Sequence, residues 1–572
     1  MSGADRKTIL STLEELALLL ELAGAHPFKS RAFANGARTL QKYEGDIAEG
    51  LESGELKKLK GVGKGLLAEI QALVETGESP AHQELKAEVP EGMMEVLKVP
   101  GLGPKRVRVL WDELGITSLA ELEYACNENR LVVLDGFGAK TQEKILKGVD
   151  YVQKFSGRYL LSDAWRRSES LLSALGEVAG VSKIELAGSI RRRKETIKDI
   201  DVLVASSDPA AVHAALVEWE GVEEVIGSGD TKTSVRMETG MQVDLRTVTE
   251  DQFPFALHYF TGSKEHNTRM RQRAKDRKMK LNEYGLFADG SEESVACASE
   301  ADVFAALDMP FVEPELREDR GEFEASELPA LVSLGDLRGA LHNHSTWSDG
   351  AHSIKDMALA AKAIGLEYIG ISDHSQTAVY ASGLKPEDVA RQHEEIDALN
   401  EELDGIVILK GIESDILTDG SLDYEDEVLA TFDFVVASVH SNFGLESAKQ
   451  TERCIRAAQN PYCSSIGHPT GRLLLGREGF DMDLRAVIDA AAENGVAMEL
   501  NANPHRLDLD WRELQYATGK GCLISIAADA HRTGGLEDLR YGVAVARKGW
   551  VTPGQVLNAM GVDELRTWLG PA

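Results

Sequence analysis

Nine side chains between residues 341 and 531 have the types and spacing of a site for several metal ions. They are six histidines and three acids: His342, His344, Asp349, His374, Glu413, His440, His468, Asp529 and His531. Imidazole and carboxylate groups are the ligands that divalent metals use in proteins when they activate water. A lone histidine is more often a hydrogen-bonded core or surface residue, but that interpretation does not account for nine such residues in one segment.

Two pairs within this set are the most informative. His342 and His344 are two residues apart, as are Asp529 and His531, and each pair follows an apolar run. Residues i and i+2 of a strand point to the same face. Each pair can therefore direct two ligands to one point where a buried strand ends.

A second group of acids lies in the first half of the chain. Asp199 and Asp201 flank Ile200 in KDIDVLVAS, and Asp244 lies in MQVDLRTV. Three carboxylates on adjacent strands would form a site for two magnesium ions with room for a triphosphate. The D-x-D pattern is weak alone, but the preceding Gly188-Ser189 and the neighbouring arginines make it moderately specific.

Three short motifs upstream place an apolar residue between two glycines, just before an amphipathic helix. Glycines allow a tight turn and close approach to a phosphate, and the free N–H groups of the next helix attract it. We interpret the motifs as helix-hairpin-helix elements that grip DNA backbones without reading sequence. The residues expected to contact DNA are Gly61, Gly63, Lys64, Gly101, Gly103 and Lys105. The third motif, at Gly136–Gly138, is less regular, and a purely structural role stays open for it.

The elements that must position these residues differ along the chain. Between residues 336 and 572, strand-like runs such as YIGIS alternate with helix-like segments such as RAVIDAAAENG. This alternation predicts an α/β barrel with the site at the carboxyl ends of its strands. The N-terminal region is predicted to be helical and the middle a small mixed sheet, so the chain is a multidomain protein of α+β and α/β classes.

Composition sets further bounds on the protein. The length of 572 residues predicts three or four domains, and a hydrophobic fraction of 43% is ordinary for globular protein. No apolar run reaches membrane length, and the five cysteines lack metal-type spacing, so we expect reduced thiols and a cytoplasmic protein. The net charge of −32 argues against nucleic acid as a partner, so any DNA contact must use local basic clusters, such as residues 191–194 and 269–280.

The C-terminal segment resembles the PHP family of polymerase-associated and histidinol-phosphatase domains. The elements HNHSTWSDG, ISDHS, GIE, SVH, GHP and ADAH carry the resemblance, over residues 336–572. It implies a distorted (β/α)7 barrel that holds three manganese or zinc ions and hydrolyses phosphoesters. It also implies a ligand set for each ion: His342, His344, Glu413 and Asp529 for the first, a bridging Glu413 with His440 and His468 for the second, and Asp349, His374 and His531 for the third.

Residues 156–315 resemble the palm and thumb of family X DNA polymerases, the DNA polymerase beta group. The palm motif is described above, and YFTGSKEHNTRMRQRA with LNEYGLF matches the thumb. The resemblance implies that Asp199 and Asp201 bind two magnesium or manganese ions and that Asp244 completes the catalytic one. It also implies contacts with the incoming nucleotide: Gly188, Ser189 and Arg192 for the triphosphate, Tyr259, Phe260 and Gly262 for the sugar, and Asn267 and Arg271 near the base pair.

We therefore predict a bacterial-type family X DNA polymerase for gap-filling repair, acting on gapped or primed DNA with deoxynucleoside triphosphates. The PHP domain is expected to be a 3′→5′ exonuclease, with endonuclease action at abasic sites as an extension. Glu69 stands where animal relatives have a Schiff-base lysine, so lyase activity is not expected unless Lys64 or another lysine takes that role. The domains are expected at residues 1–85, 86–155, 156–248, 249–318 and 336–572, with a linker at 319–335, in a monomer associated with the nucleoid.

Two other functions stay open on the sequence alone. The PHP domain could act on a small phosphomonoester, as histidinol phosphatases do. The chain could instead be a DNA-binding scaffold with a weakly active palm.

Overall fold

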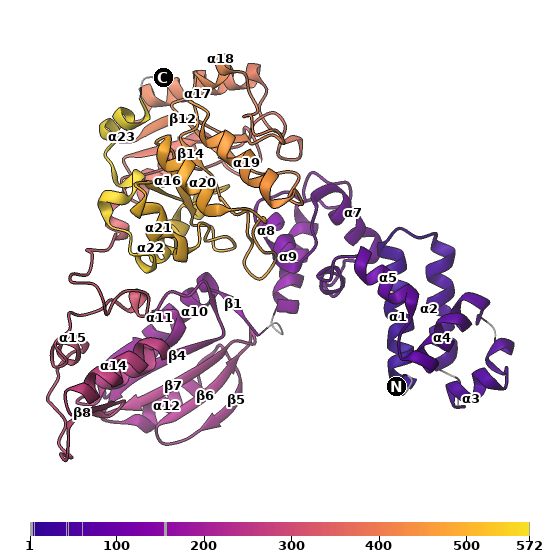
Figure 1. Cartoon of the computed structure of the whole chain (residues 1–572), viewed down its shortest axis with the longest axis horizontal. Coiled ribbons are helices and arrows are strands. Elements are labelled where there is room, and N and C mark those ends of the chain that lie inside the picture. Colours follow the sequence, from indigo (N-terminus) through magenta and orange to yellow (C-terminus); the bar gives the residue numbers. More distant parts are fainter. Residues whose placement is uncertain are drawn as a thin grey trace. The chain divides into compact units, whose positions relative to one another are not determined.

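The computed structural model describes residue 4 and residues 6–41, 43, 45–59, 61–153 and 157–570. The chain folds into two compact units, Met1–Val152 and Gln153–Ala572, and each is considered by itself (Figure 1).

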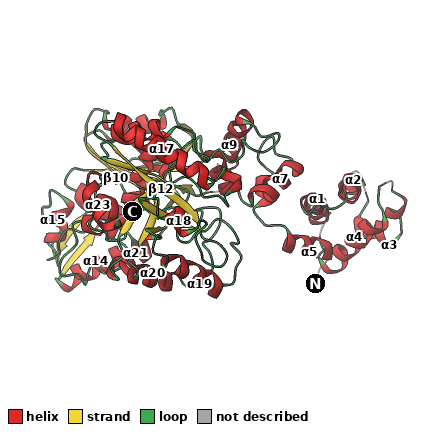
Figure 2. Ribbon diagram, turned by 90° about the horizontal axis from the view of Figure 1, so that it is seen from above, coloured by secondary structure: helices red, strands yellow, loops and turns green. Residues whose placement is uncertain are grey.

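The first unit is helical, and Figure 2 shows only helices and loops in it. Its apolar residues follow the period of a helix: Ile9, Leu13, Leu16 and Leu20 of α1 are all buried. This stripe packs into a core shared with the later helices. The elements are α1 (Arg6–Leu22), α2 (Pro27–Gln41), α3 (Ile47–Glu52), η1 (Leu56–Lys58), α4 (Lys64–Thr76), α5 (Pro80–Glu88), α6 (Met93–Val96), α7 (Pro104–Leu114), α8 (Leu119–Asn127) and α9 (Ala139–Gln153).

The second unit begins with a five-stranded mixed sheet, here called the central sheet. Its strand order is β2-β4-β7-β6-β5, and only β4 and β7 pair in parallel. Buried residues of α10 and α12 pack on the sheet. The elements are β1 (Tyr159–Leu160), α10 (Leu161–Gly176), β2 (Val181–Leu186), α11 (Gly188–Arg191), β3 (Thr196–Ile197), β4 (Asp199–Ser206), α12 (Pro209–Val217), β5 (Val222–Ser228), β6 (Lys232–Met237) and β7 (Gln242–Val248).

A smaller segment of helices and one hairpin follows the central sheet. It contains α13 (Phe253–Thr261), α14 (Lys264–Asp276), β8 (Met279–Asn282), β9 (Gly285–Ala288) and α15 (Glu300–Ala305). The chain then runs to the last domain through two short turns of 3-10 helix, η2 (Pro314–Leu316) and η3 (Leu334–Asp336). Arg317 in this connection is fully buried and ion-pairs with Glu300, so the connection is packed against the segment that precedes it.

The last domain is a barrel of seven parallel strands in sequential order, β10 to β16. Strands such as β11 and β16 are buried along their whole length, as expected where helices cover a parallel sheet. The backbone N–H of His344 donates to the Ala530 carbonyl at 2.9 Å, which brings the first and last strand ends together. The strands are β10 (Gly339–Ala340), β11 (Tyr368–Ile371), β12 (Val407–Asp415), β13 (Phe434–Ser438), β14 (Ser465–Ile466), β15 (Ala497–Asn501) and β16 (Ile524–Ala527).

Helices cover the outside of the barrel (Figures 1 and 2). They are α16 (Ile354–Ala363), α17 (Pro386–Glu402), α18 (Asp426–Leu429), α19 (Ser447–Ala458), α20 (Leu484–Glu493), α21 (Trp511–Gly519), α22 (Leu539–Lys548) and α23 (Val562–Leu569). Short 3-10 turns, η4 (Val379–Ala381), η5 (Thr533–Asp538), η6 (Pro553–Gln555) and η7 (Leu557–Ala559), complete the domain.

The fold classes predicted from the sequence are confirmed: a helical N-terminal region, a mixed central sheet and a seven-stranded barrel. The exact domain boundaries stay predictions. Of the helices described, none combines the length and apolarity needed to cross a bilayer.

Candidate active sites

The nine predicted metal-binding residues of the barrel lie together at the carboxyl ends of its strands. His342 and His344 follow β10, His374 follows β11, and Glu413 lies near the end of β12. His440 follows β13, and His468 follows β14. Asp529 and His531 come just after β16, and Asp349 lies in the loop between β10 and α16. The backbone is left-handed at Asp529 (φ 52°) and His468 (φ 26°), a conformation that non-glycine residues adopt mainly where a site requires it.

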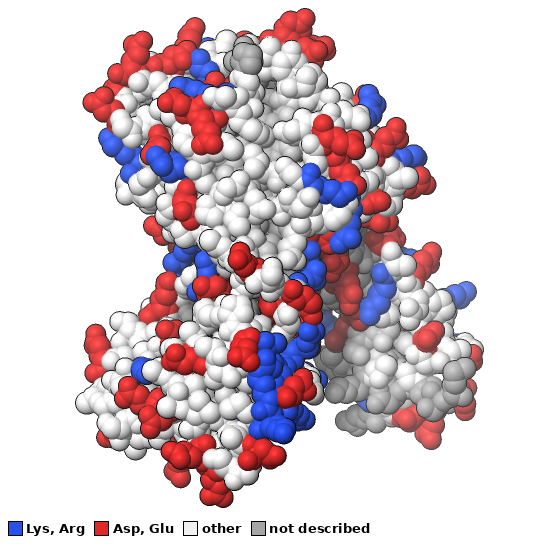
Figure 3. Space-filling view, turned by 60° about the vertical axis from the view of Figure 1, so that its left-hand side comes forward, with Lys and Arg blue, Asp and Glu red and all other residues white. Residues whose placement is uncertain are grey.

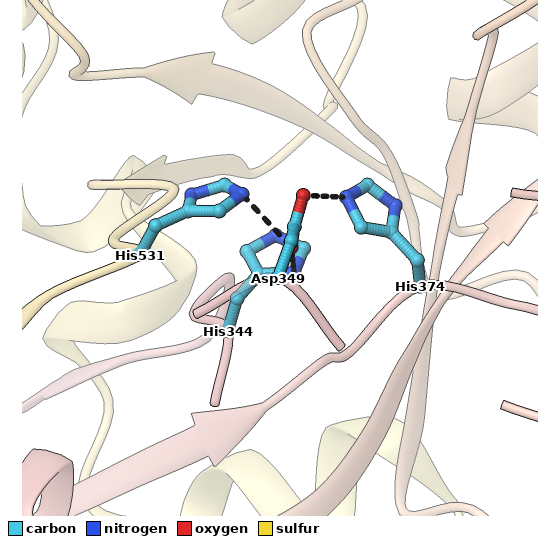
Figure 4. A group of neighbouring side chains, drawn as sticks. All are labelled: His344, Asp349, His374 and His531. Carbon is cyan, nitrogen blue, oxygen red and sulfur yellow. Dashed lines mark ion pairs between the residues drawn. The ribbon is translucent and has the colours of Figure 1, made fainter. Parts of the chain in front are cut away.

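One group within this cluster has Asp349 between two imidazoles (Figure 4). Its carboxylate oxygens lie 3.3 Å from Nε2 of His531 and 3.5 Å from Nε2 of His374. His344 Nδ1 lies 3.9 Å from the same carboxylate. These four side chains each offer a ligand atom within 4.8 Å of the others, which is close enough for one ion.

Glu413 lies at the centre of the remaining ligands. One of its oxygens is 2.9 Å from Nε2 of His468, 3.2 Å from Nε2 of His440 and 3.3 Å from Nε2 of His342. Its other oxygen is 3.7 Å from Nε2 of His344, which is also 3.2 Å from Asp529. A carboxylate in this position can bridge two ions. Because His344 and His374 each belong to two of the groups, the geometry alone leaves the allocation of ligands to ions open.

Titration behaviour and unused ring nitrogens both fit a metal centre. Burial would raise the pKa of Glu413, but the imidazoles of His440, His342 and His374 outweigh burial and hold that pKa well below its usual range. Burial, with the nearby His531 and His374, lowers the pKa of His344 to about 3, so this ring is neutral. Both ring nitrogens of His344 are buried without a well-formed hydrogen bond to any described residue. The neutral His344 ring is the form that a divalent ion requires. Burial would lower the pKa of His374, but Asp349 and Glu413 outweigh burial and raise that pKa to about 10, so a bound ion would have to displace a proton from this ring.

Two carboxylates that the sequence analysis missed hold ligand histidines from behind. Glu499 on β15 accepts from His342 Nδ1 at 2.7 Å and from the His468 backbone N–H at 2.9 Å. Asp415 at the end of β12 lies 2.7 Å from His440 Nδ1. Such partners fix the tautomer and leave the other nitrogen for the metal. The only sequence signal was an acid in each of the apolar runs VAMELN and GIESDI.

The three predicted acids of the central sheet also come together. Asp201 on β4 is directly opposite Asp244 on the parallel neighbour β7, and Asp199 lies two residues before Asp201. Burial raises the pKa of Asp201 to about 7, and the charges of Asp199 and Asp244 add to this effect. Three crowded carboxylates favour a cation between them. The residues present therefore fit a divalent ion site.

Asp244 has further partners in this structure. Lys232 Nζ lies 2.7 Å from it, and Ser234 and Gln242 donate hydrogen bonds to its other oxygen. Burial would raise the pKa of Asp244, but these three bonds outweigh it and lower that pKa. Lys232 was not predicted as a site residue, since a lone lysine on a strand carries no distinguishing signal.

The first residue of α11, Gly188, lies against these acids. Gly188 has φ +60°, and a Cβ placed there would come within 2.0 Å of an Asp201 oxygen, so only glycine fits. Ser189 and Arg192, which follow it, line a cavity of about 390 Å³. Lys194 and Lys198 lie on the same cavity, so it is suited to a phosphate chain.

The residues predicted to line the sugar and base pair lie at the junction of α13 and α14. The rings of Tyr259 and Phe260 are in edge-to-face contact at 5.1 Å, and Asn267 donates to the Tyr259 carbonyl at 2.7 Å. Gly262 is packed beside the guanidinium of Arg192. Arg271 lies on the exposed face of α14, one turn beyond Asn267.

The glycine motifs of the helical unit have the predicted form. Gly61 (φ +95°) and Gly101 (φ +89°) take the left-handed conformation, and Gly63 and Gly103 are the residues that precede α4 and α7. Nothing described lies within 4 Å of a Cβ built on Gly63 or Gly103, so a phosphate can approach both helix starts. The side chains of Lys64 and Lys105 are exposed beside these turns.

Glu69 has a structural partner of its own. It accepts a hydrogen bond from Ser79, the residue that caps α5. This contact links two helices and leaves no amine at the position where a lyase would need one.

Charge is unevenly distributed on the surface of the second unit. Figure 3 shows acidic side chains scattered over the visible face, with basic side chains gathered in one patch in its lower part. Helix α14, which lies after the central sheet, contributes basic residues to this unit at Lys264, Arg269, Arg271, Arg273 and Lys275. A local basic surface therefore exists in spite of the net charge of −32.

Four protein-family models match this chain. A helix-hairpin-helix domain matches residues 4–79, and a SAM-like helix-hairpin-helix tandem matches residues 93–149. The DNA polymerase beta thumb matches residues 256–318, and the PHP domain matches residues 340–503. The third glycine motif thus falls within a tandem helix-hairpin-helix match.

Known proteins match over nearly the whole chain or over a smaller share of it. DNA polymerase/3′-5′ exonuclease PolX of Bacillus subtilis (strain 168) is 41% identical over 567 residues, which is 99% of each chain. Proteins named probable phosphatase match a smaller share: one of Acetivibrio thermocellus is 34% identical over 28% of this chain and 63% of its own length. Another, of Thermoanaerobacter sp. (strain X514), is 28% identical over 38% of this chain and 88% of its own length. The sequence motifs, the fold and these matches together show that this chain belongs to the family X DNA polymerases that carry a C-terminal PHP domain.

Proposed function

We propose that the protein is a gap-filling DNA polymerase whose barrel is a metal-dependent 3′→5′ exonuclease. The observation that carries this proposal is the 41% identity, over 99% of both chains, to a protein named DNA polymerase/3′-5′ exonuclease PolX. The two separate acidic clusters support it, since each reaction needs its own divalent ions. The proposed substrates are gapped or primed DNA and deoxynucleoside triphosphates. The proposed place of action is the nucleoid in the bacterial cytoplasm, as a monomer.

At the central sheet, Asp199 and Asp201 are assigned to two ions, and Asp244 completes the catalytic one. Two magnesium or manganese ions bound there would lower the pKa of the primer 3′ hydroxyl and stabilise the leaving pyrophosphate. Asp244 is also assigned to accept the proton of that hydroxyl. Around it, Gly188, Ser189 and Arg192 bind the triphosphate, Tyr259, Phe260 and Gly262 the sugar, and Asn267 and Arg271 lie near the nascent base pair.

In the barrel, three manganese or zinc ions are assigned to the nine ligands in the allocation that the family resemblance implies. Bound ions would activate water and neutralise charge on the phosphate under attack. Glu499 and Asp415 orient His342 and His440, so that each ring presents Nε2 to the ions. Burial would raise the pKa of three carboxylates of the cluster, but the surrounding imidazoles outweigh burial and lower it, so these carboxylates stay ionised. They are those of Asp349, Glu413 and Asp529.

In the helical unit, the turns at Gly61–Gly63 and Gly101–Gly103 are assigned to the DNA backbone. Their open helix starts and the exposed side chains of Lys64 and Lys105 support a grip on phosphate without base recognition. No lyase step is assigned, because Glu69 cannot form an imine.

The two activities can be measured on one preparation. The protein should add a nucleotide to the primer end of a one-nucleotide gap when magnesium or manganese is supplied. Without nucleotides, it should shorten a 5′-labelled single strand from its 3′ end in manganese. Failure of well-folded protein to extend gapped DNA with either metal would contradict the polymerase assignment.

A phosphomonoesterase barrel is the second candidate, favoured by the matches to proteins named probable phosphatase. The helix-hairpin-helix elements on the same chain favour DNA instead. Comparison of kcat/KM for p-nitrophenyl phosphate and for a 3′-ended oligonucleotide distinguishes the two. If the barrel is an exonuclease, kcat/KM should be orders of magnitude higher for the oligonucleotide than for p-nitrophenyl phosphate. A higher kcat/KM for the small ester would favour the phosphatase.

A further inference from the structure

A lysine of the barrel is buried behind α11 and Arg192, the segment proposed to bind the triphosphate and here called the triphosphate turn. Lys548 is the last residue of α22, and its side chain is fully buried. Its ammonium group lies 2.7 Å from Glu318 Oε1, 2.9 Å from the Arg192 carbonyl oxygen and 3.3 Å from the Glu315 carbonyl oxygen. An ammonium has three N–H donors, and all three have an acceptor here.

All three acceptors of Lys548 belong to parts of the chain outside the barrel strands and helices. Arg192 follows the turn at α11, and Glu315 and Glu318 lie in the connection that precedes the barrel. A buried ammonium without such partners would be strongly destabilising. The lysine therefore depends on the docking of the barrel against the central sheet, and the triphosphate turn gains a backbone contact from it.

Glu318 transmits this contact to the guanidinium of Arg192. Its Oε1 accepts from Arg192 Nε at 3.0 Å, and its Oε2 pairs with Lys194 at 3.0 Å. Burial would raise the pKa of Glu318, but Lys548 and Arg192 outweigh it and lower that pKa to about 2. The other side of the Arg192 guanidinium donates to the Thr261 carbonyl. Arg192 is thus held on two sides, and its remaining donors border the phosphate cavity.

The barrel also supplies part of the wall of that cavity. Leu474 and Arg512 of the barrel line it together with Ser189, Arg192 and Lys194. Arg512 pairs with Glu195 at 3.1 Å, which fixes the barrel beside the same turn.

We propose that Lys548, through Glu318, positions Arg192 for the triphosphate, so that the barrel is a structural part of the polymerase nucleotide pocket. This inference rests on the polymerase function proposed above. Lys548 is a positioning residue and does not itself contact the nucleotide.

The test is one-nucleotide gap filling by the full-length protein, with KM for the nucleotide and kcat measured separately. K548M should raise KM about fivefold, the effect of roughly one lost hydrogen bond, with kcat changed less than about twofold. The inhibition constant of pyrophosphate should rise by a similar factor, since the same arginine holds both. Exonuclease activity of K548M should equal that of the wild type.

A matched control separates positioning from simple docking. Arg540, on the same helix, pairs with Glu169 of α10 at 3.4 Å and has no contact with the triphosphate turn. R540M should leave KM and the pyrophosphate constant unchanged. Equal KM values for K548M and the wild type, or an equal rise in R540M, would overturn the proposal.

Two further outcomes are distinguishable. If K548M misfolds and loses exonuclease activity, E318Q serves as the second variant, because it keeps the size of the side chain. E318Q must then show the selective rise in KM for the nucleotide. A KM in E318Q equal to that of the wild type would overturn the proposal. Wild-type protein that adds no nucleotide to the gap would instead refute the polymerase function, on which this inference rests.

Discussion

Several ligand histidines of the barrel owe their orientation to carboxylates behind them. Glu499 receives three polar contacts, from His342, from the His468 backbone and from Asn501, and Asn501 also donates to Asp529. A ring that is fixed in tautomer and direction loses less entropy when it binds an ion. The cluster is therefore pre-organised for ions by residues outside the proposed ligand set.

Replacement of Glu499 by glutamine should weaken metal binding at the barrel. We expect the manganese concentration for half-maximal exonuclease activity to rise by about 10- to 100-fold, because His342 loses its carboxylate partner. Nucleotide addition should be unaffected. The control is E513Q, which alters a carboxylate on α21 that pairs with Arg485 of α20 on the outside of the barrel. Unchanged manganese dependence in E499Q would contradict this role.

At this scale the sequence predicted the histidine and acid cluster well, but it could not predict the partners behind it. The i, i+2 spacing of His342 with His344 and of Asp529 with His531 follows directly from strand geometry. Glu499 becomes a partner of His342 only because closure of the barrel leaves a single strand, β16, between β15 and β10, which is a property of the tertiary fold. Lys232 meets Asp244 for the same reason, through the pairing of β6 with β7.

At the scale of elements, the two glycine turns of the first unit, each followed by a helix start, have an open geometry. Gly63 and Gly103 precede α4 and α7, with free helix N–H groups and an exposed lysine next to each turn. Contacts of this kind are electrostatic and independent of base sequence.

Substitution of both lysines, K64A with K105A, should weaken DNA binding equally for unrelated sequences. The slope of log K against log salt concentration should become shallower by about 2, since each phosphate contact contributes about 0.9. The control is K86A, whose lysine pairs with Glu15 away from the turns. Fluorescence anisotropy at several salt concentrations measures the slope, and a slope equal to that of the wild type would exclude these lysines from the interface.

Helix α15 joins the central sheet to the connection before the barrel through one glutamate. Glu300 pairs with Arg191 and with the fully buried Arg317, each at 2.6 Å. Burial would raise the pKa of Glu300, but the two arginines outweigh it and lower that pKa to about 2. The folded-state pKa of Glu300 is below its ordinary value of 4.5, so the stabilisation is complete above pH 4.5 and is lost as the pH falls towards 2.

The substitution E300Q should therefore lower the free energy of unfolding by about 3 kcal/mol at pH 7. The difference in the free energy of unfolding between E300Q and the wild type should become smaller below pH 4.5. Urea unfolding followed by tryptophan fluorescence at several pH values measures it. E324Q, which removes the exposed partner of Arg269, should behave as the wild type. A difference that stays constant with pH would show that the ion pairs of Glu300 are not its cause.

The existence of these elements could be predicted, but their contacts could not. Glycine spacing identified the hairpins, and the alternation of apolar runs with helical segments identified the barrel. The connection at residues 319–335 was predicted as a linker from its acidic and proline-containing composition. The buried pairing of Glu322 with His266 of α14 arises from tertiary packing that composition does not reveal.

At the scale of the whole molecule, the second unit brings two acidic centres onto one folded body. The central sheet and the barrel are joined by ion pairs such as Arg512 with Glu195 and Lys548 with Glu318, and by the edge contact of Trp165 with Tyr541. In the sequence, Lys548 belongs to a helix end, VARKGW, that resembles any basic helix terminus. Lys548 is buried because the barrel packs against the central sheet, and the sequence pattern does not reveal this packing.

The central claim is that one chain contains two independent centres, one that joins nucleotides and one that cuts phosphodiesters. The most direct test measures both activities in two variants, D201A and H344A, on the same gapped and single-stranded substrates. D201A should lose nucleotide addition by at least about 1,000-fold and keep its exonuclease activity, and H344A should show the reverse. Loss of the same activity in both variants, or of neither, would contradict the claim.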